Sequence, residues 1–244
     1  MARHPSRSET ERLISDLRAR GFCVLEEAWS PEEGGRIHGL LDRLLEKVLD
    51  RDRTGAFAGF GCKLLSLRHE EPAMRDYFDS PTVRGFLEEV LEDEVSFRMT
   101  GVRWSTVDSD PRVIWHDHYY WDPDLLSRRE RFERIAFNCY LDGSSQESGP
   151  LIVSPRAFHD PAHAPSADVH APRPEEIEVE VPPRSIVFMD SALYHCARTG
   201  MSANLRTMWG GQAQARSCTR AHPEDTDGVL AAVRAWKRRH ESPR

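Results

Sequence analysis

The spacing of hydrophobic residues changes once along the chain, and this change separates a helical first part from a strand-rich remainder. Over the first 94 residues, hydrophobic side chains recur every three or four positions, which is the period of a helix with one buried face. Leu13, Ile14 and Leu17 form the first such stripe, and Gly21 ends it. The segment Phe22–Leu25 is too short for a helix and is typical of a strand.

Two Ser-Pro pairs predict the starts of further helices. Ser30-Pro31 is followed by Glu33, so the serine can cap the helix while the glutamate reaches back to the cap, an arrangement called a capping box. Ser80-Pro81 repeats the start signal. The stripes that follow these starts are Ile37, Leu40, Leu41, Leu44, Leu45 and Val48 in one case, and Val83, Phe86, Leu87, Val90 and Leu91 in the other.

After about residue 95 the hydrophobic period becomes two, which predicts an antiparallel β half. The predicted strands are Val95–Arg98, Val102–Val107, Val113–His118, Ile135–Leu141, Leu151–Val153, Ile177–Val181, Ile186–Met189 and Arg206–Gln212. Long irregular segments, Asp122–Glu133 and Pro155–Pro174, interrupt them, and a last helix is expected at about Gly228–Arg238. The fold class is therefore α+β, mainly β, with N-terminal helices packed outside a sandwich or barrel. We expect one domain over 1–244, with a helical part at 1–94, a β core at 95–216 and a C-terminal helix at 217–244.

Composition and charge exclude several classes of protein. The 244 residues are 39% hydrophobic and 30% charged, as in ordinary globular proteins, and the net charge of −7 argues against a nucleic-acid binder. No apolar run approaches the roughly 20 residues of a membrane span. The N-terminus lacks the apolar core of a secretion signal, and the five cysteines form no Cys-x-x-Cys pair. We therefore expect a cytoplasmic protein with free thiols.

Three histidines occur on strand-like sequence at a spacing that suits a metal ion. His116 and His118 lie in the segment Val113–Trp121, and residues i and i+2 of a strand project from the same face. His195 follows the predicted strand Ile186–Met189, so it can approach from a neighbouring strand. Three ligands that leave positions open form the kind of site that non-haem iron needs. Arg206, eleven residues after His195, can offer a two-pronged guanidinium to a dicarboxylate such as 2-oxoglutarate.

With these residues in place, the chain resembles the phytanoyl-CoA dioxygenase (PhyH-like) family of Fe(II)/2-oxoglutarate oxygenases over almost its whole length. The resemblance lies in the segments RARGFCVLEEAWSPEE, WHDH, RIAFNCYLDG, ESGPLIVSPRAFH and RSIVFMDSALYHCARTGMSANLRTMW. It implies a double-stranded β-helix, or jelly roll, with His116 and His195 as iron ligands and Arg206 as the anchor of 2-oxoglutarate. Arg103 and Asn138 lie on strands where relatives place polar groups that contact this cosubstrate, although alternation does not say which face they use.

One position departs from the family pattern. The family has a metal-binding Asp where this sequence has His118, and Asp117 stands one residue earlier. A regular strand makes the ligand set His116, His118 and His195, without a carboxylate. A β-bulge would instead turn Asp117 inward. Strand alternation favours His118, and both interpretations stay open.

The leading hypothesis is an Fe(II)/2-oxoglutarate-dependent dioxygenase that oxidises a small molecule, and we expect a role in secondary metabolism. Hydroxylation is the default outcome, and desaturation or ring formation share its early steps. The expected partners are the substrate, 2-oxoglutarate and dioxygen, with no nucleic acid and no membrane, and the protein is expected to be a monomer or homodimer. Two alternatives are a three-His metal enzyme, a dioxygenase or hydrolase, that does not use 2-oxoglutarate, and a non-catalytic small-molecule binding protein on a decayed oxygenase scaffold.

Overall fold

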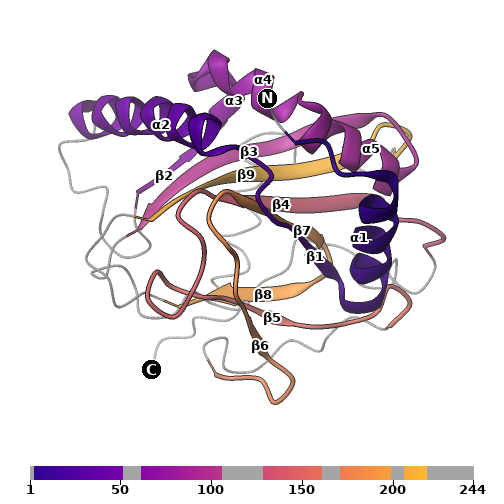
Figure 1. The fold of residues 1–244 in the computed structure, drawn as a ribbon. Helices are drawn as coiled ribbons and strands as arrows, with labels where there is room; N and C mark the ends of the chain where they lie inside the picture. The colour runs from indigo at the N-terminus through magenta and orange to yellow at the C-terminus, as the bar shows by residue number, and fades with distance from the viewer. Residues whose placement is uncertain (1–2, 52–61, 106–128, 161–170, 199–205, 219–244) are drawn as a thin grey trace, which may run out of the picture.

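Two antiparallel sheets face each other, and helices cover the outer side of the larger sheet (Figure 1). The computed structural model describes residues 3–51, 62–105, 129–160, 171–198 and 206–218. The helical elements are α1 (Arg7–Arg20), α2 (Pro31–Arg51), α3 (Leu67–Glu70), η1 (Pro72–Met74), α4 (Arg75–Phe78), η2 (Pro81–Gly85) and α5 (Phe86–Leu91). The strands are β1 (Phe22–Leu25), β2 (Cys62–Leu65), β3 (Val95–Ser105), β4 (Arg134–Tyr140), β5 (Leu151–Ser154), β6 (Ile177–Val179), β7 (Ser185–Asp190), β8 (Tyr194–Ala197) and β9 (Arg206–Ala215).

The larger sheet has the strand order β1-β7-β4-β9-β3-β2, and the smaller sheet has the order β6-β5-β8. Every pairing between these strands is antiparallel. The predicted α+β class, with N-terminal helices outside the strands, is confirmed. In Figure 1 the smaller sheet lies beneath the larger one, on the side away from α2, α4 and α5.

Alternation along β4 sends side chains to two different cores. Phe137 and Cys139 belong to the large core between the sheet and the helices, whereas Ala136 and Tyr140 belong to the core between the two sheets. Residues i and i+2 of a strand share a face, so one strand supplies both cores. The inner face of the large sheet is therefore available to form a site opposite the small sheet.

The structure confirms the predicted end of the first helix at Gly21 and the predicted start of the next at Ser30, and it shows that Ser6 caps the start of α1. Ser6 accepts a hydrogen bond from the Glu9 backbone N–H at the start of α1, and Gly21 ends that helix in the left-handed conformation at φ +80°. Ser30 and Glu33 form the expected capping box, since the Ser30 hydroxyl accepts from the Glu33 N–H while the Glu33 carboxylate accepts from the Ser30 N–H.

The structure differs from the predicted elements in several places. The prediction of two separate strands, Val95–Arg98 and Val102–Val107, was wrong. One strand, β3, runs continuously from Val95 to Ser105 with a bulge between Phe97 and Met99. The strands β2 and β8 and the short helices α3, η1 and α4 were missed. The start signal at Ser80 leads into a π-helical turn, η2, before α5 begins. The predicted strand Val113–His118 and the helix Gly228–Arg238 lie outside the described residues.

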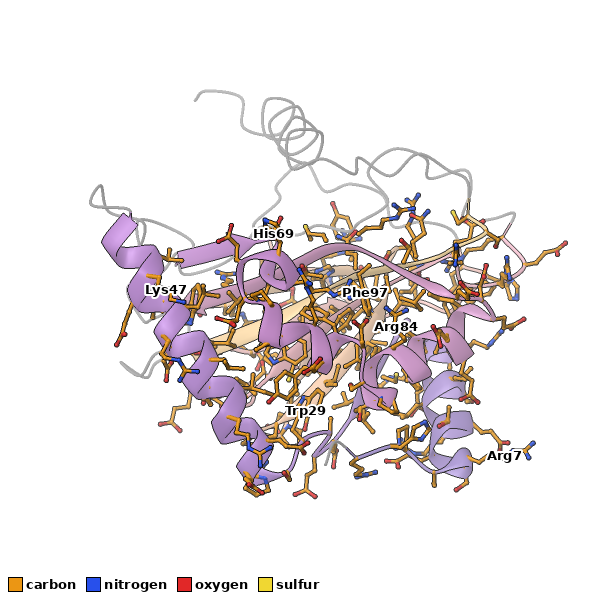
Figure 2. The ribbon with its side chains drawn as sticks, turned by 90° about the horizontal axis from the view of Figure 1, so that it is seen from above. Arg7, Trp29, Lys47, His69, Arg84 and Phe97 are labelled. Atoms are coloured by element: carbon orange, nitrogen blue, oxygen red, sulfur yellow. The ribbon has the colours of Figure 1, made fainter. Side chains whose placement is uncertain are left out.

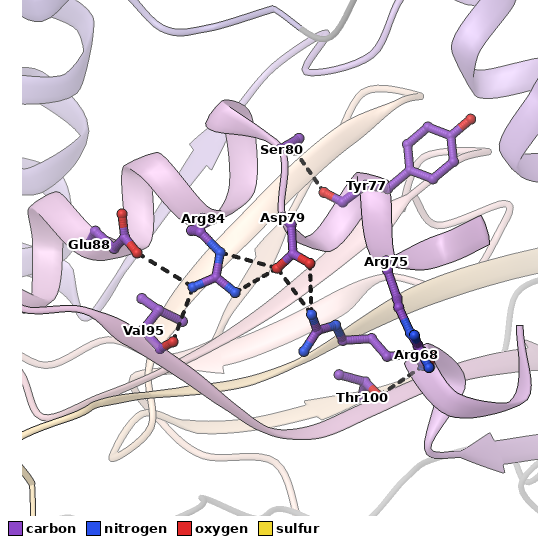
Figure 3. A network of polar contacts seen from close by, with 9 residues as sticks. All are labelled: Arg68, Arg75, Tyr77, Asp79, Ser80, Arg84, Glu88, Val95 and Thr100. Carbon is purple, nitrogen blue, oxygen red and sulfur yellow. Dashed lines mark hydrogen bonds and ion pairs between the residues drawn. The ribbon is translucent and has the colours of Figure 1, made fainter. Parts of the chain in front are cut away.

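A carboxylate between two arginines ties the short helices to the outer face of β3 (Figure 3). Arg68 donates to both oxygens of Asp79 at 3.0 and 2.8 Å, and Arg84 donates to Asp79 through Nε at 3.1 Å. Arg84 also donates to the Val95 carbonyl at 3.1 Å and lies 5.0 Å from the centre of the Phe97 ring. Figure 2, which looks down on the helical side, shows Arg84 and Phe97 close together.

No helix among the described residues is long and apolar enough to cross a membrane. Cys23, Cys139, Cys196 and Cys218 are free thiols, as expected.

Candidate active site

A cavity of about 150 Å³ lies between the two sheets. Its walls come from β3, β4 and β9 of the larger sheet and from β5 and β8 of the smaller one. Four residues that the sequence marked as site candidates line this cavity, namely Arg103, Asn138, His195 and Arg206. Three strands of one sheet and two of the other therefore bring together residues that lie up to 103 positions apart, from Arg103 to Arg206.

The pairing of β9 with β3 and β4 places residues of the three strands side by side in the cavity wall. Gly210 of β9 pairs with Gly101 of β3 on one side and with Asn138 of β4 on the other. The backbones are so close here that a Cβ on Gly210 would overlap the Phe137 carbonyl oxygen. A side chain is therefore excluded at Gly210, which lines the cavity next to Asn138.

His195 is held in the protonation state that suits a metal ligand. Only 6% of its surface is exposed, and burial lowers the pKa of the imidazole, which favours the neutral ring. Its Nδ1 lies 2.9 Å from the Leu193 carbonyl oxygen. A carbonyl can only accept, so Nδ1 carries the proton and the lone pair of the neutral ring is on Nε2. This is the second hydrogen bond that metal-ligating histidines almost always make.

Arg206 is a cation buried in the cavity wall. It is 6% exposed, and burial lowers the pKa of its guanidinium, an effect that Tyr140 and Asp142 oppose. Nη1 donates to the Gly149 carbonyl, while the buried Nε atom has no hydrogen-bond partner among the residues that the structure describes. Within the described part of the chain, no carboxylate forms an ion pair with Arg206. Because Nε and Nη2 share one edge of the guanidinium, this edge fits the carboxylate of a ligand.

Local structure around residue 149 explains how Arg206 is held. Gly149 adopts φ +97°, a conformation that favours glycine, and its carbonyl also accepts from the Ser144 hydroxyl at 3.1 Å. The Ser144 hydroxyl in turn accepts from the Leu151 N–H at 2.8 Å. The turn before β5 therefore orients the carbonyl that fixes one side of the guanidinium.

Arg103 and Asn138 both face the cavity, which settles the side that alternation left open. Tyr140 and Gln212, which sequence reasoning missed, line the cavity as well. Burial raises the pKa of Tyr140, while the charges of Arg206 and Arg103 act in the opposite direction. Tyr140 lies two residues after Asn138 on β4, and Gln212 lies six residues after Arg206 on β9. Residues an even number of positions apart share a strand face, and this was the signal that could have identified them.

His116, His118 and Asp117 lie outside the described residues. Among the residues that the structure does describe, no three His, Cys, Asp or Glu side chains form a group that could hold a metal ion. His195 is thus the one predicted ligand whose surroundings are visible.

The sequence profile of the phytanoyl-CoA dioxygenase (PhyH) family matches residues 17–208. The match covers most of the chain, and the protein belongs to this family of Fe(II)/2-oxoglutarate-dependent enzymes. No curated protein matches the sequence significantly.

Solved structures show the same fold at low sequence identity. The carbocyclase SnoK from nogalamycin biosynthesis, a non-haem α-ketoglutarate-dependent enzyme, is 16% identical with a TM-score of 0.67, over 91% of this chain and 89% of SnoK. HygX from Streptomyces hygroscopicus, solved with nickel and 2-oxoglutarate, is 16% identical with a TM-score of 0.68, over 86% and 89%. EctD from S. alaskensis, solved with 2-oxoglutarate and 5-hydroxyectoine, is 16% identical with a TM-score of 0.63, over 84% and 76%. The expected double-stranded β-helix is confirmed.

Proposed function

We propose that this protein is a non-haem Fe(II)- and 2-oxoglutarate-dependent oxygenase that oxidises a small molecule. One observation carries the proposal: Arg206 is a buried cation in the wall of the cavity that His195 also lines, and its Nε atom has no partner within the described part of the chain. A buried charge is costly unless it is paired, so this guanidinium favours the entry of an anion. The family and the ligands named for HygX and EctD support 2-oxoglutarate as that anion.

Each of the candidate residues has a separate part in this proposal. His195 would hold Fe(II) through Nε2 together with His116 and His118, or with Asp117 in place of His118 if a bulge turns it inward. Arg206 would bind the far carboxylate of 2-oxoglutarate through its Nε and Nη2 edge, and Arg103 and Asn138 would contact the same cosubstrate. When bound, iron and 2-oxoglutarate supply the activation of dioxygen, with release of succinate and carbon dioxide.

The remaining lining of the cavity supports a small organic substrate. Met99, Ala136 and Leu151 contribute apolar surface to it, and apolar walls exclude water from a reactive site. The association of SnoK with nogalamycin biosynthesis supports a role in secondary metabolism. Hydroxylation of an aliphatic carbon is the default reaction.

Succinate formation from 2-oxoglutarate in the presence of Fe(II) and dioxygen tests this function. We expect turnover with the wild-type protein, and a rise of at least about 30-fold in the KM for 2-oxoglutarate in Arg206→Ala, which corresponds to about 2 kcal/mol for one lost charge partner. Arg216→Ala is the matched control, because Arg216 lies just beyond β9 and its side chain is 72% exposed on Glu94. An unchanged KM in Arg206→Ala would contradict the proposed role of this arginine.

Metal binding separates the proposal from its alternatives. Isothermal titration with Co(II), an oxygen-stable substitute for Fe(II), should show one site that His195→Ala removes. Loss of affinity in His118→Ala but not in Asp117→Ala would identify the ligand set with three histidines. Co(II) binding without consumption of 2-oxoglutarate would indicate a three-His enzyme of another kind, and absence of metal binding would indicate a binding protein on a decayed scaffold.

A further inference from the structure

A buried carboxylate lies five residues before His195 and is held by two arginines. Asp190, at the end of β7, accepts from Arg129 Nη1 at 2.7 Å and from Arg129 Nη2, and it also accepts from Arg156 Nη1 at 3.3 Å. The three side chains are at most 2% exposed. Charge-assisted hydrogen bonds in such surroundings are strong and directional, so the position of the Asp190 carboxylate is well defined.

The same carboxylate closes the turn that leads to His195. Asp190 Oδ1 accepts from the Ala192 N–H at 3.1 Å, and the Asp190 carbonyl accepts from the Leu193 N–H at 2.8 Å. The Asp190 N–H donates to the Gly21 carbonyl at 2.9 Å. Side-chain and backbone bonds together therefore fix the turn from Asp190 to Leu193.

This turn presents the Leu193 carbonyl to His195. Leu193 is fully buried, and its carbonyl oxygen accepts the proton of His195 Nδ1 at 2.9 Å. The hydrogen bond on one ring nitrogen decides which nitrogen keeps the lone pair. If the turn changed shape, this carbonyl would move away and the ring could place its proton on Nε2 instead.

We infer that Asp190 is a positioning residue that holds His195 in the tautomer with the proton on Nδ1, by fixing the turn whose Leu193 carbonyl accepts that proton. The functional meaning of this tautomer rests on the proposed function, because a metal ion binds to an unprotonated Nε2. The assignment of the tautomer itself depends only on contacts within this chain. A merely structural Asp190 would affect stability and leave the tautomer unchanged.

Long-range ¹H–¹⁵N NMR on metal-free, ¹⁵N-histidine-labelled protein tests the inference directly. The His195 signals are identified by their absence in His195→Ala. We expect the wild type to show the Nδ1–H tautomer, and Asp190→Asn to show a mixture in which the Nε2–H form is readily detected. The Kd for Co(II) should rise about tenfold in Asp190→Asn, the lower end of the range for outer-shell partners of metal ligands.

Asp79→Asn is the matched control, because Asp79 also lies between two arginines but contacts neither the turn nor the cavity. It should leave the tautomer and the Co(II) affinity unchanged. Should Asp190→Asn fail to fold, Arg156→Lys replaces it, since Arg129 still pairs with Asp190 there; we expect the same tautomer shift with a smaller amplitude.

The outcomes of this experiment separate the two hypotheses. A wild-type tautomer in the folded Asp190→Asn or Arg156→Lys protein would overturn the inference, even if the wild type binds Co(II) and turns over 2-oxoglutarate. A tautomer shift in a protein that binds no Co(II) would support the role of Asp190 and contradict the proposed function.

Discussion

Two carboxylates of this protein each lie between two arginines, and their burial differs greatly. The Asp190 side chain is 1% exposed, and Arg129 and Arg156 are equally buried. The Asp79 side chain is 39% exposed, and its two arginine partners are each 29% exposed. Both clusters place one carboxylate between two guanidinium groups, and Asp190 has one further bond, from the Ala192 N–H, so burial is the main difference between them.

The buried cluster lies next to the candidate site, and the exposed cluster lies on the outer surface of the larger sheet. Asp190 fixes the turn that leads to His195, which lines the cavity. Asp79 joins short helices to the outer face of the large sheet (Figure 3), where water can replace a lost partner. The comparison teaches that the number of ion pairs does not determine how much they stabilise the fold, because screening by solvent weakens each exposed pair.

Removal of each carboxylate should give the largest contrast. Asp190→Ala leaves two buried guanidinium groups without their shared carboxylate, and we expect a loss of about 3–5 kcal/mol in the free energy of unfolding. Asp79→Ala should cost at most about 1 kcal/mol, the range of exposed ion pairs. Urea unfolding followed by circular dichroism at pH 7 measures both. Equal losses for the two variants would show that burial does not separate the clusters.

Local features of this structure could be predicted from the sequence, whereas contacts between residues far apart in the chain could not. Hydrophobic period, capping residues and the left-handed Gly21 predicted the α+β class and the ends of the first helices, because each of these signals acts within a few residues. Neither partner of Asp190 could be predicted, since Arg129 lies 61 residues away and Arg156 lies 34 residues away. Such pairs form only after the strands have aligned.

The candidate site shows the same limit. Arg103, Asn138, His195 and Arg206 were identified by their spacing and by the family resemblance, and all of them line one cavity. Alternation placed residues on two faces of each strand without saying which face the small sheet covers. That information comes from sheet packing, which is why Tyr140 was missed although it lies on the same face as Asn138.

A glycine that supports the Asp190 turn offers a contrast of intermediate size. Gly21 has φ +80°, and a Cβ there would lie 2.8 Å from Leu193 Cδ1 and 3.1 Å from the Arg156 carbonyl oxygen. Gly21→Ala should therefore cost at least about 1–2 kcal/mol for the left-handed conformation. Gly35→Ala in the exposed part of α2, where a Cβ meets nothing within 4 Å, should instead stabilise by about 0.5–1 kcal/mol. Thermal unfolding of both variants checks these opposite signs, and a stabilised Gly21→Ala would show that the turn adapts freely.

The smallest effect concerns the acid sensitivity of the exposed cluster. Partial burial acts to raise the pKa of Asp79, but the hydrogen bonds and charges of Arg84 and Arg68 outweigh it, so the pKa lies below its ordinary value of 3.8. A lowered pKa in the folded state means that the carboxylate stabilises the protein above pH 3.8, and that this contribution is lost as the pH falls through the lowered value. The difference in urea midpoint between wild type and Asp79→Asn should therefore be present at pH 6 and shrink towards zero as the solution is acidified below pH 3.8. A difference that stays constant over this range would mean that Asp79 acts through neutral hydrogen bonds rather than through its charge.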